Sequence, residues 1–535
     1  MKTGDTPARG DHWTVLIWMV FGVLVGLLMQ WKLEAPAYLG MEVSTGSNAV
    51  RVTGLTPGGP AAKTRVSVGS DLRGVVLKRG TEEESIVWLR TPGDLEEGVL
   101  PHVAQGEVLW FLPARGADDP RAVEEFDPAT DKPVAVSVGL SKDSQRAKFI
   151  APFAFVASLF ISLLMMLIVP VVLSSIVAGV AGVGAMKDLS RLGGKTFVYY
   201  MGTSLLAIMV GQTLVNVIRP GDGAQLGLAG QAFGSENDSS QFIEVFQRMV
   251  PTNVFSALGD NSAMLAIIFF ALILGVAITR SGEPHSTRMR EWFVSLNEVM
   301  MKMAAGVLKL LPYGVFALMV KVVAGTGIEP FKALLLYMLT VTLALLIHAL
   351  ITLPLVLKFI GGLSPIRWGK AMAPALMTAF STSSSSMTLP ITMETVHARG
   401  RVSKKVGSFT LPLGATINMD GTALYECIGV IFLAQYYASV GGDPLTMAQQ
   451  GLIVIMALMA SVGAAGIPSA GLVMMLTILS ALHLPLEGAA LLLAVDRPLD
   501  MLRTVVNVWS DSCGAAVVAR SEGEEGPLDP ALDVV

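Results

Sequence analysis

Charged residues are scarce in this chain of 535 residues: 15% are Asp, Glu, Lys or Arg, against about 25% in average soluble proteins. This scarcity, together with 52% hydrophobic residues, excludes an ordinary soluble globular protein. The net charge of −4 gives no reason to expect nucleic acid as a partner. The two cysteines, Cys427 and Cys513, lie in apolar helical context, which excludes a disulfide framework and a cysteine-based zinc site. We expect no enzyme, because the motifs include no nucleophile–base pair or nucleotide loop.

What the chain has instead is a series of apolar runs of about 17 residues or more, which suit helices that cross a bilayer. Examples are Trp13–Met29, Phe153–Val183, Ala263–Thr279 and Ala333–Leu357. They predict an all-α polytopic membrane protein. We interpret 13–31 as a retained first transmembrane helix, because no small-residue cleavage site follows its apolar run.

The connections between the apolar runs differ in charge. Lys and Arg cluster in alternate connections, for example around Arg288 and around Lys404. The positive-inside rule assigns such connections to the cytoplasm. This predicts a multi-pass protein of the inner (plasma) membrane, with residues 1–12 and 521–535 on the cytoplasmic side.

Residues 41–147 are polar, with short alternating patches between Gly and Pro turns, which predicts β-strands. The charge pattern places this insertion on the periplasmic or extracellular side, between the first two membrane helices. Within it, Gly54–Val76 resembles the strand, short helix and Gly-Asp turn of a PDZ-like domain, although Thr64 and Arg65 replace the usual Ala-Gly. The alternative is a small β-rich insertion that shields or braces the membrane part. The ligand of the insertion is unknown.

The last third of the chain contains two apolar segments interrupted by small or polar residues, at Ser381–Pro390 and Ser461–Gly471. Paired interruptions of this kind point to a transporter binding site, where irregular backbone is surrounded by protein or by a water-filled cavity. We predict re-entrant helical hairpins at 369–396 and 446–485. The predicted fold also has a small β-rich extracytoplasmic insertion and eight transmembrane helices: the first at 13–31, helices 2–6 within 149–365, helix 7 at 405–440 and helix 8 at 487–520.

The stretch Leu411–Glu426, between the two hairpins, places Asp420 and Gly421 in the middle of an apolar span. An ionisable residue at that depth costs about 2.5–3.5 kcal/mol, so it usually faces the interior of the helix bundle. Gly421 weakens the helix, and an unwound turn there would free backbone carbonyls for a small cation. The alternative is a kinked span with a solvated polar notch.

The final helix carries five polar residues within an arc of about 80°: Asp496, Asp500, Arg503, Asn507 and Asp511. Three carboxylates against one guanidinium, with Asp420 nearby, predict an electronegative pocket and hence uptake coupled to cations. The Arg503 guanidinium suits a carboxylate, and Asp500 suits an ammonium, so a ligand with both groups is an acidic amino acid. The alternative is a salt-bridge ladder that satisfies itself and holds the bundle together.

Four motifs carry a resemblance to a known family: the serine-rich segment that ends in TLP, NMDGT at Asn418–Thr422, GIPSAG at 466–471, and Asp500–Asp511. In these, and everywhere outside 41–147, the chain resembles the glutamate/aspartate transporter family, the dicarboxylate/amino acid:cation symporters. The resemblance implies a homotrimer and an elevator-type mechanism, in which a mobile transport domain slides past a fixed scaffold. It implies no cofactor, with Na⁺ and/or H⁺ as co-transported ions.

The resemblance also assigns residues to sites. The substrate would be held by Ser384, Ser385, Ser386, Thr422, Gly466, Asp500, Arg503, Thr504 and Asn507. Sodium would bind oxygen ligands in three sites: Gly414, Asn418, Asn507 and Asp511 in the first; Thr416, Ser461, Val462 and Ala464 in the second; Tyr200, Thr203, Ser204, Asn418 and Asp420 in the third. Glu426 would carry a coupled proton, or would make only a structural hydrogen bond.

The chain departs from the family in the position of one arginine. Ser383 and Met501 stand where different members of the family carry an arginine, and Arg497 stands nearby, followed by Pro498. Arg497 would either supply the missing guanidinium from a new position or pair only with Asp496.

The predicted function is a secondary active symporter for glutamate or aspartate. A symporter for C4-dicarboxylates or for neutral amino acids is the nearest alternative; Asp500 argues against the first and Arg503 against the second. A substrate sensor or anion channel is an alternative of a different class.

Overall fold

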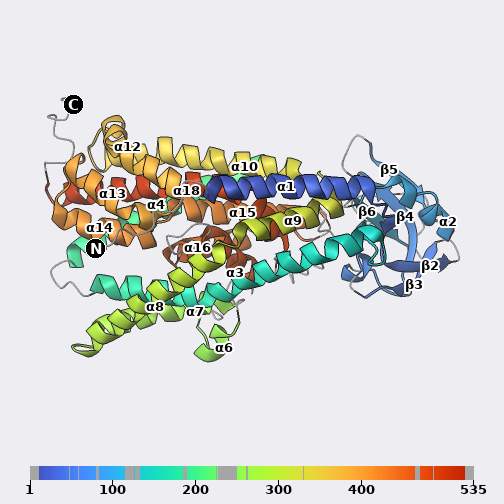
Figure 1. The fold of residues 1–535 in the computed structure, drawn as a ribbon, viewed down its shortest axis with the longest axis horizontal. Helices are drawn as coiled ribbons and strands as arrows, with labels where there is room; N and C mark the ends of the chain where they lie inside the picture. Colours follow the sequence, from blue (N-terminus) through green and yellow to red (C-terminus); the bar gives the residue numbers. More distant parts are fainter. Residues whose placement is uncertain are drawn as a thin grey trace.

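The protein is described here from a computed structural model, which covers residues 11–46, 49–57, 59–64, 66–79, 83–105, 107–114, 126, 133–184, 190–224, 226, 250–260, 263–328, 330–440, 442–463, 470–482, 484–485 and 487–524. Helices run along the long axis of the molecule, and a small β-sheet lies at one end of them (Figure 1).

The sheet is antiparallel, and its strands follow the order β2 (Met41–Thr45), β3 (Val50–Leu55), β4 (Asp71–Leu77), β6 (Val108–Pro113) and β7 (Val134–Ser137). A short strand, β5 (Ser85–Trp88), also pairs with β4. In β3, Val50 and Val52 are buried and Arg51 between them is exposed, as expected for a strand with one face on a core. The insertion has its own hydrophobic core, into which Leu109 and Phe111 of β6 also pack. Its short helices are η1 (Ala61–Lys63), α2 (Pro92–Glu96) and η2 (Leu100–His102). The PDZ-like resemblance stays a prediction.

The sheet is joined to the helices at one place. Strands β1 (Ala37–Tyr38) and β8 (Gly139–Leu140) pair with each other, so the two ends of the insertion lie side by side. Beside them, Arg146 is 7% exposed and donates hydrogen bonds to the carbonyls of Leu33 (2.8 Å) and Gln30 (3.0 Å). It also donates to the side chain of Gln105, whose amide donates to the carbonyl of Ala35 at 2.7 Å. Carbonyls at a helix C-terminus have no partner within the helix, so Arg146 supplies the missing donors at the end of α1.

Among the described residues, four stretches are long and apolar enough to cross a membrane: 145–182 in α3 (Gln145–Gly184), 191–218 in α4 (Ser190–Ile218), 330–359 in α10 (Pro330–Ile347), η5 (His348–Thr352) and α11 (Leu353–Phe359), and 404–439 in α14 (Lys404–Ile417) and α15 (Asp420–Ser439). A fifth results if α8 (His285–Leu308) and α9 (Leu311–Thr326), which meet at 48°, form one span. Residues 285–326 are thus divided between two helices. The chain is a polytopic, mainly helical membrane protein.

The remaining helices are shorter or lie near the carboxyl end: α1 (Asp11–Lys32), α6 (Val254–Leu258), α7 (Met264–Arg280), α12 (Pro365–Thr382), α13 (Ser385–Ala398), α16 (Met447–Gly463), α17 (Ala470–Ala481) and α18 (Glu487–Ser521). Although Pro498 lies inside α18, the helix continues through it.

The helices pack in two groups. In the first, α1 lies along α9, and α3 packs against α7, α8 and α9. In the second, α15 packs against α4, α16, α17 and α18, and α18 also contacts α10, α12, α13 and α14. Fewer contacts join the groups, mainly from α3 to α14, α16 and α17 and from α9 to α18.

Two helix breaks lie in the second group. Between α12 and α13, Ser383 adopts a left-handed conformation with φ 49°, and Ser384 caps α13 by accepting a hydrogen bond from the Met387 amide. Between α14 and α15, Asn418 (ψ 80°) and Met419 (ψ 61°) are not helical. The second break precedes the position at which Gly421 was expected to weaken the helix.

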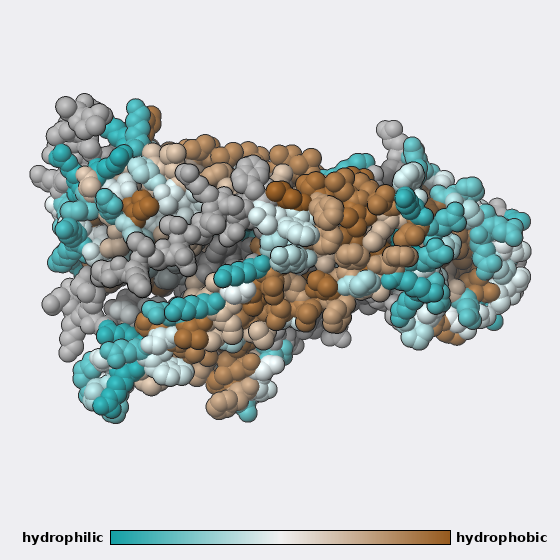
Figure 2. Space-filling view, in the orientation of Figure 1, coloured by the Kyte–Doolittle hydropathy of each residue, from teal (hydrophilic) through white to brown (hydrophobic). Residues whose placement is uncertain are grey.

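The hydropathy of the outer surface changes along the same long axis. Hydrophobic residues cover the middle of the molecule, and hydrophilic residues gather on the sheet and at the opposite end (Figure 2). At the end opposite the sheet, the Glu522 carboxylate accepts hydrogen bonds from Arg191 and Lys195 at 2.6 Å each, which lowers the pKa of Glu522 to about 2. These bonds hold the end of α18 against the start of α4.

The joint at Arg146 gives the first prediction. Arg146→Gln removes charged donors from the Leu33 and Gln30 carbonyls, and hydrogen bonds to charged groups contribute about 1.5–3 kcal/mol each. We expect the midpoint of thermal unfolding in detergent to fall by several degrees. The control is Lys148→Gln, since Lys148 is exposed on the same helix. Equal midpoints for both variants would contradict the importance of this joint.

Candidate functional site

The Asp420 carboxylate lies at the start of α15 with 0% exposure, and donors from three other elements meet on it. Ser204 of α4 donates to Oδ1 at 2.6 Å. Ser510 of α18 donates to Oδ2 at 2.7 Å, and His348 Nε2 of η5 lies 3.0 Å from the same oxygen. Because a carboxylate only accepts, the proton of this last bond belongs to His348 Nε2. A buried carboxylate is tolerated only when it is bonded in this way.

Asn418 connects Asp420 to a second carboxylate. Its amide nitrogen donates to Asp511 Oδ1 at 2.9 Å and to the Ser510 hydroxyl at 3.0 Å. The Thr203 hydroxyl lies 3.3 Å from Asn418 Oδ1 and 3.4 Å from Asp420 Oδ1. The cluster is therefore rich in oxygen atoms and contains two carboxylates.

Close packing shapes the same cluster. A Cβ on Gly414 would lie 2.5 Å from Asp511 Oδ1 and 2.7 Å from the Tyr200 hydroxyl. The Tyr200 hydroxyl itself donates to the carbonyl of Thr410 at 2.8 Å. Asp511 and Tyr200 therefore pack this closely against α14 because residue 414 has no side chain.

A second charged cluster lies further toward the start of α18. Arg503, 1% exposed, donates from Nη2 to Asp496 Oδ1 and to Asp500 Oδ1, at 2.8 Å each. Arg497 Nη1 lies 3.4 Å from Asp500 Oδ2. Asp496 and Arg497 are also buried, at 2% and 8% exposure. Two carboxylates and two guanidiniums therefore balance in charge.

Arg497 adds a second guanidinium to the one counted from the sequence, so four buried carboxyl groups, those of Asp420, Asp496, Asp500 and Asp511, stand against two guanidiniums. Arg497 was expected either to supply a missing guanidinium or to pair with Asp496, and its side chain lies 3.4 Å from Asp500. The other cluster, around Asp420 and Asp511, contributes two of these four buried carboxyl groups. The face of α18 carries two sites of different charge.

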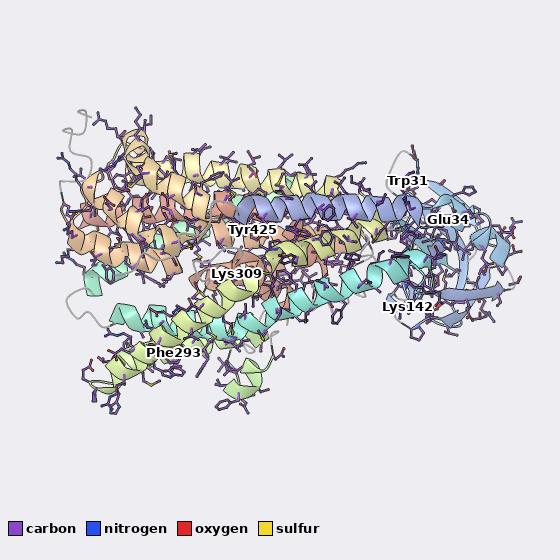
Figure 3. All side chains as sticks on the ribbon, viewed as in Figure 1. Trp31, Glu34, Lys142, Phe293, Lys309 and Tyr425 are labelled. Atoms are coloured by element: carbon purple, nitrogen blue, oxygen red, sulfur yellow. The ribbon has the colours of Figure 1, made fainter. Side chains whose placement is uncertain are left out.

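Arg503 has further donors. Its Nε and Nη1 have no hydrogen-bond partner among the described residues, and its guanidinium carbon lies 3.8 Å from the centre of the Tyr425 ring, a cation–π contact. A Cβ on Gly471 would lie 2.7 Å from Nη1. Tyr425 lies near the middle of the helical body (Figure 3). This guanidinium has spare donors in a buried, closely packed place.

Asn507 lies between the two clusters along α18. Its side-chain oxygen accepts from the Gly421 amide at 2.8 Å, and its amide donates to the Thr422 hydroxyl at 3.2 Å. Because Gly421 directly follows Asp420, this contact ties α18 to the break between α14 and α15.

The serine run lies on helices that pack against α18, since α12 and α13 both contact it. Ser384 and Ser385 are buried and Ser386 is exposed. Thr504, on α18, is buried and donates to the carbonyl of Asp500 at 2.8 Å. These are the remaining described residues of the expected substrate site; Gly466 lies outside the described residues.

In the expected second sodium site, the hydrogen bonds of Thr416 and Ser461 do not connect the two residues. The Thr416 hydroxyl donates to the Leu413 carbonyl at 3.0 Å, and the Ser461 hydroxyl to the Leu458 carbonyl at 2.8 Å. Both partners belong to the same helix as the donor. Val462 is the penultimate residue of α16, and Ala464 lies outside the described residues.

Glu426 is buried at 0% exposure, and neither carboxyl oxygen has a hydrogen-bond partner among the described residues. It follows Thr422 by four residues, about one helical turn. Within the described residues, no structural hydrogen bond explains a carboxyl group at this position.

Comparison with known proteins identifies the family. The family model described as "Sodium:dicarboxylate symporter family" matches residues 134–521. The chain belongs to this family. The symporter is 34% identical to a proton/glutamate-aspartate symporter of Escherichia coli over 68% of its own length and 84% of that protein. It is 32% identical to excitatory amino acid transporter 3 of Homo sapiens (70% and 80%), and 33% identical to a proton/sodium-glutamate symport protein of Geobacillus stearothermophilus (69% and 87%).

Two polar residues of the symporter's Asp420 cluster were missed by sequence reasoning, His348 and Ser510. His348 had a signal of its own, because it is an ionisable residue inside the apolar run Ala333–Leu357. It lies in η5, a single π-helical turn, and such turns often occur at functional sites.

Replacement of His348 tests its contact with Asp420. His348→Phe removes a donor from a buried carboxylate of the symporter, which costs about 1–3 kcal/mol or more. We expect a lower midpoint of thermal unfolding, with partial recovery in His348→Gln, which keeps an N–H donor. His285→Phe is the control, because His285 is exposed. The contact has no energetic role if His348→Phe unfolds at the wild-type temperature.

Proposed function

We propose that this protein is a secondary active symporter that imports glutamate or aspartate, driven by sodium, protons or both. One observation carries the proposal: α18 holds a buried guanidinium with spare donors and, two turns later, a buried oxygen-rich cluster with two carboxylates. The relatives described above, named as glutamate or glutamate-aspartate symporters, support the same class of substrate.

The proposed substrate site uses the residues expected from the sequence. The spare donors of Arg503 would take the side-chain carboxylate, and Thr422 would add a hydroxyl. Asp500 would take the ammonium group. The buried end of the serine run and Asn507 would meet the main-chain carboxylate, since α13 packs against α18.

The proposed ion sites use oxygen ligands, which hard cations prefer. Thr203 and Ser204 lie within hydrogen-bonding distance of Asp420, and Thr203 also lies within that distance of Asn418. A sodium ion would replace donors that now meet on Asp420. Asp511 would serve a neighbouring ion together with Asn418. Cations in these positions would offset the two buried carboxylates.

Coupling between substrate and ions would pass through Asn507. This side chain contacts Gly421 and Thr422, directly after the residue that gathers the ion cluster. A substrate that binds to the Asn507 side chain would therefore alter the backbone next to Asp420. The two binding events would share one helix break, which is a physical reason for each to favour the other.

We propose eight transmembrane helices and two re-entrant hairpins, built from α12 with α13 and from α16 with α17. The group around α15 and α18 would be the mobile transport domain, and the group around α3 and α9 the fixed scaffold. The sparse packing between the groups supports an elevator-type movement. The insertion 41–147 would stand on the periplasmic or extracellular side of the inner (plasma) membrane.

We also propose a homotrimer. Charged residues on α8 and at its end are exposed, among them Glu298, Lys302 and Lys309, and Lys309 lies about midway along the body (Figure 3). Charges exposed to lipid at such depth are costly. Neighbouring copies of the chain would cover them.

The test is uptake of labelled aspartate into proteoliposomes with sodium and proton gradients imposed separately. Accumulation under a sodium gradient would support the oxygen cluster as an ion site. Accumulation under a proton gradient alone would assign the coupling to Glu426. Absence of aspartate and glutamate uptake under either gradient would overturn the proposal and favour a sensor or channel.

Gly414 offers a direct test of the ion cluster. Gly414→Ala places a Cβ where Asp511 and Tyr200 now lie, and overpacking of this kind costs about 1–3 kcal/mol. We expect the sodium concentration for half-maximal uptake to rise by about 10-fold or more. Gly407→Ala on the same helix is the control, because a Cβ there would meet its nearest atom only at 4.0 Å. An unchanged sodium dependence would remove Asp511 from the ion site.

Glu426→Gln tests the proton pathway. The amide cannot carry a proton, so we expect aspartate uptake to lose its response to a proton gradient while sodium-driven uptake persists. A pH-sensitive dye inside the vesicles measures the proton movement. Glu298→Gln is the matched control, because Glu298 is exposed. Proton movement that survives Glu426→Gln would leave that carboxyl a structural role only.

A further inference from the structure

We propose that the insertion 41–147 restrains the movement of the transport domain, because it is attached to the scaffold and also contacts the end of α15. The inference rests on the proposed function, in which the group around α15 and α18 moves past the group around α3 and α9. It gives the insertion a role in setting the rate of transport.

The insertion is attached to helices of the first group. Arg146, at the start of α3, donates hydrogen bonds to the Leu33 and Gln30 carbonyls at the end of α1. Strand β8 contacts α9, and a Cβ on Gly325 of α9 would lie 3.9 Å from Leu140 Cδ1 of β8. The insertion therefore keeps its position relative to the proposed scaffold.

The central strands of the sheet are apolar on both faces. Five consecutive residues of β4 and four of β6 are buried, whereas a strand with one face in water alternates between buried and exposed residues. Since successive side chains point to opposite faces, Val75 and Phe111 pack into the core of the insertion, and Val76 and Trp110 into a second cluster. This second face needs a cover of its own.

Part of that cover comes from the second group of helices. The second cluster consists of Val76, Trp110, Leu112 and Ala135, with Ile86, Trp88, Val108, Phe126 and Val440 packed against it. Of these described residues, only Val440 lies outside the insertion. Val440 is the C-cap of α15 and also packs against the core of the helices. One side chain thus contacts both the sheet and the proposed transport domain.

The place of Val440 on α15 links this contact to the ion cluster. The helix begins at Asp420 and has 20 residues, so Val440 lies about 30 Å from Asp420 at the other end of the same helix. When the transport domain moves past the scaffold, Val440 would leave a sheet that does not follow it. Apolar surface on both sides would then meet water, which is unfavourable. The contact therefore opposes the movement.

The test compares two neighbouring valines of β4, both with 0% exposure. Val76→Ala weakens the cluster that Val440 contacts. Val75→Ala is the matched control, because it removes the same atoms from the other face. We expect the initial rate of labelled aspartate uptake into proteoliposomes to rise about 3-fold or more in Val76→Ala and in Val440→Ala. The rate of Val75→Ala should stay at that of the wild type.

Double variants show whether the two residues act through one contact. Val76→Ala combined with Val440→Ala should be no faster than the faster single variant, because the same contact is lost only once. Val75→Ala combined with Val440→Ala should keep the full effect of Val440→Ala.

A cross-link covers the case in which a valine variant does not fold. Val440→Cys with Val108→Cys, joined by a bifunctional methanethiosulfonate reagent, should stop aspartate uptake, and a reductant should restore it. The two native cysteines are buried, so the wild type should not respond. Ile86→Cys with Val108→Cys, which lies wholly within the insertion, is the control pair and should keep its uptake after the same treatment.

The outcomes separate the two proposals. The restraint is overturned if Val76→Ala is no faster than Val75→Ala, if the thiols at 440 and 108 do not cross-link, or if the cross-linked protein still takes up aspartate. Each of these results leaves the proposed function intact. Failure of the wild type to take up any acidic amino acid overturns the proposed function itself.

Discussion

A carboxylate with no exposed surface, Asp420, holds the second group of helices together. Its hydrogen bonds come from α4, η5 and α18, and it stands itself at the start of α15. A buried charge is stable only while its partners surround it, so these four elements keep a fixed arrangement around one atom group. An ion that enters the cluster must replace hydrogen-bond partners of Asp420. It therefore changes the contacts of each element that supplies a partner.

The same physical rule explains which parts of the site could be predicted from sequence. Asp420 and Asp511 stood out because a carboxyl group inside an apolar span is costly unless it has a role. The rule applied equally to His348, yet its run Ala333–Leu357 contains no Asp or Glu that could be its partner. The partner lies 72 positions away in the chain, and only the fold brings the two together.

On α18, the contacts between arginines and carboxylates were harder to predict than the residues that share one face of the helix. Helical spacing identified the polar face, but it could not state which acid each arginine contacts. Arg503 reaches back seven residues to Asp496, and Arg497 reaches Asp500 from beside that face. Side chains as long as arginine can meet partners well outside their own position on the helix. The backbone was equally hard to predict in detail. The helix was expected to weaken at Gly421, but the break lies at Asn418 and Met419, just before it.

The paired strands β1 and β8 give the insertion a simple relation to the rest of the chain. The chain enters and leaves the insertion at neighbouring points. Insertions of whole domains into other proteins are tolerated at surface positions with this property. A helical membrane protein of this kind can therefore gain or lose such a module without any change in the threading of its helices. The sheet and the membrane body are free to have separate evolutionary histories within one gene.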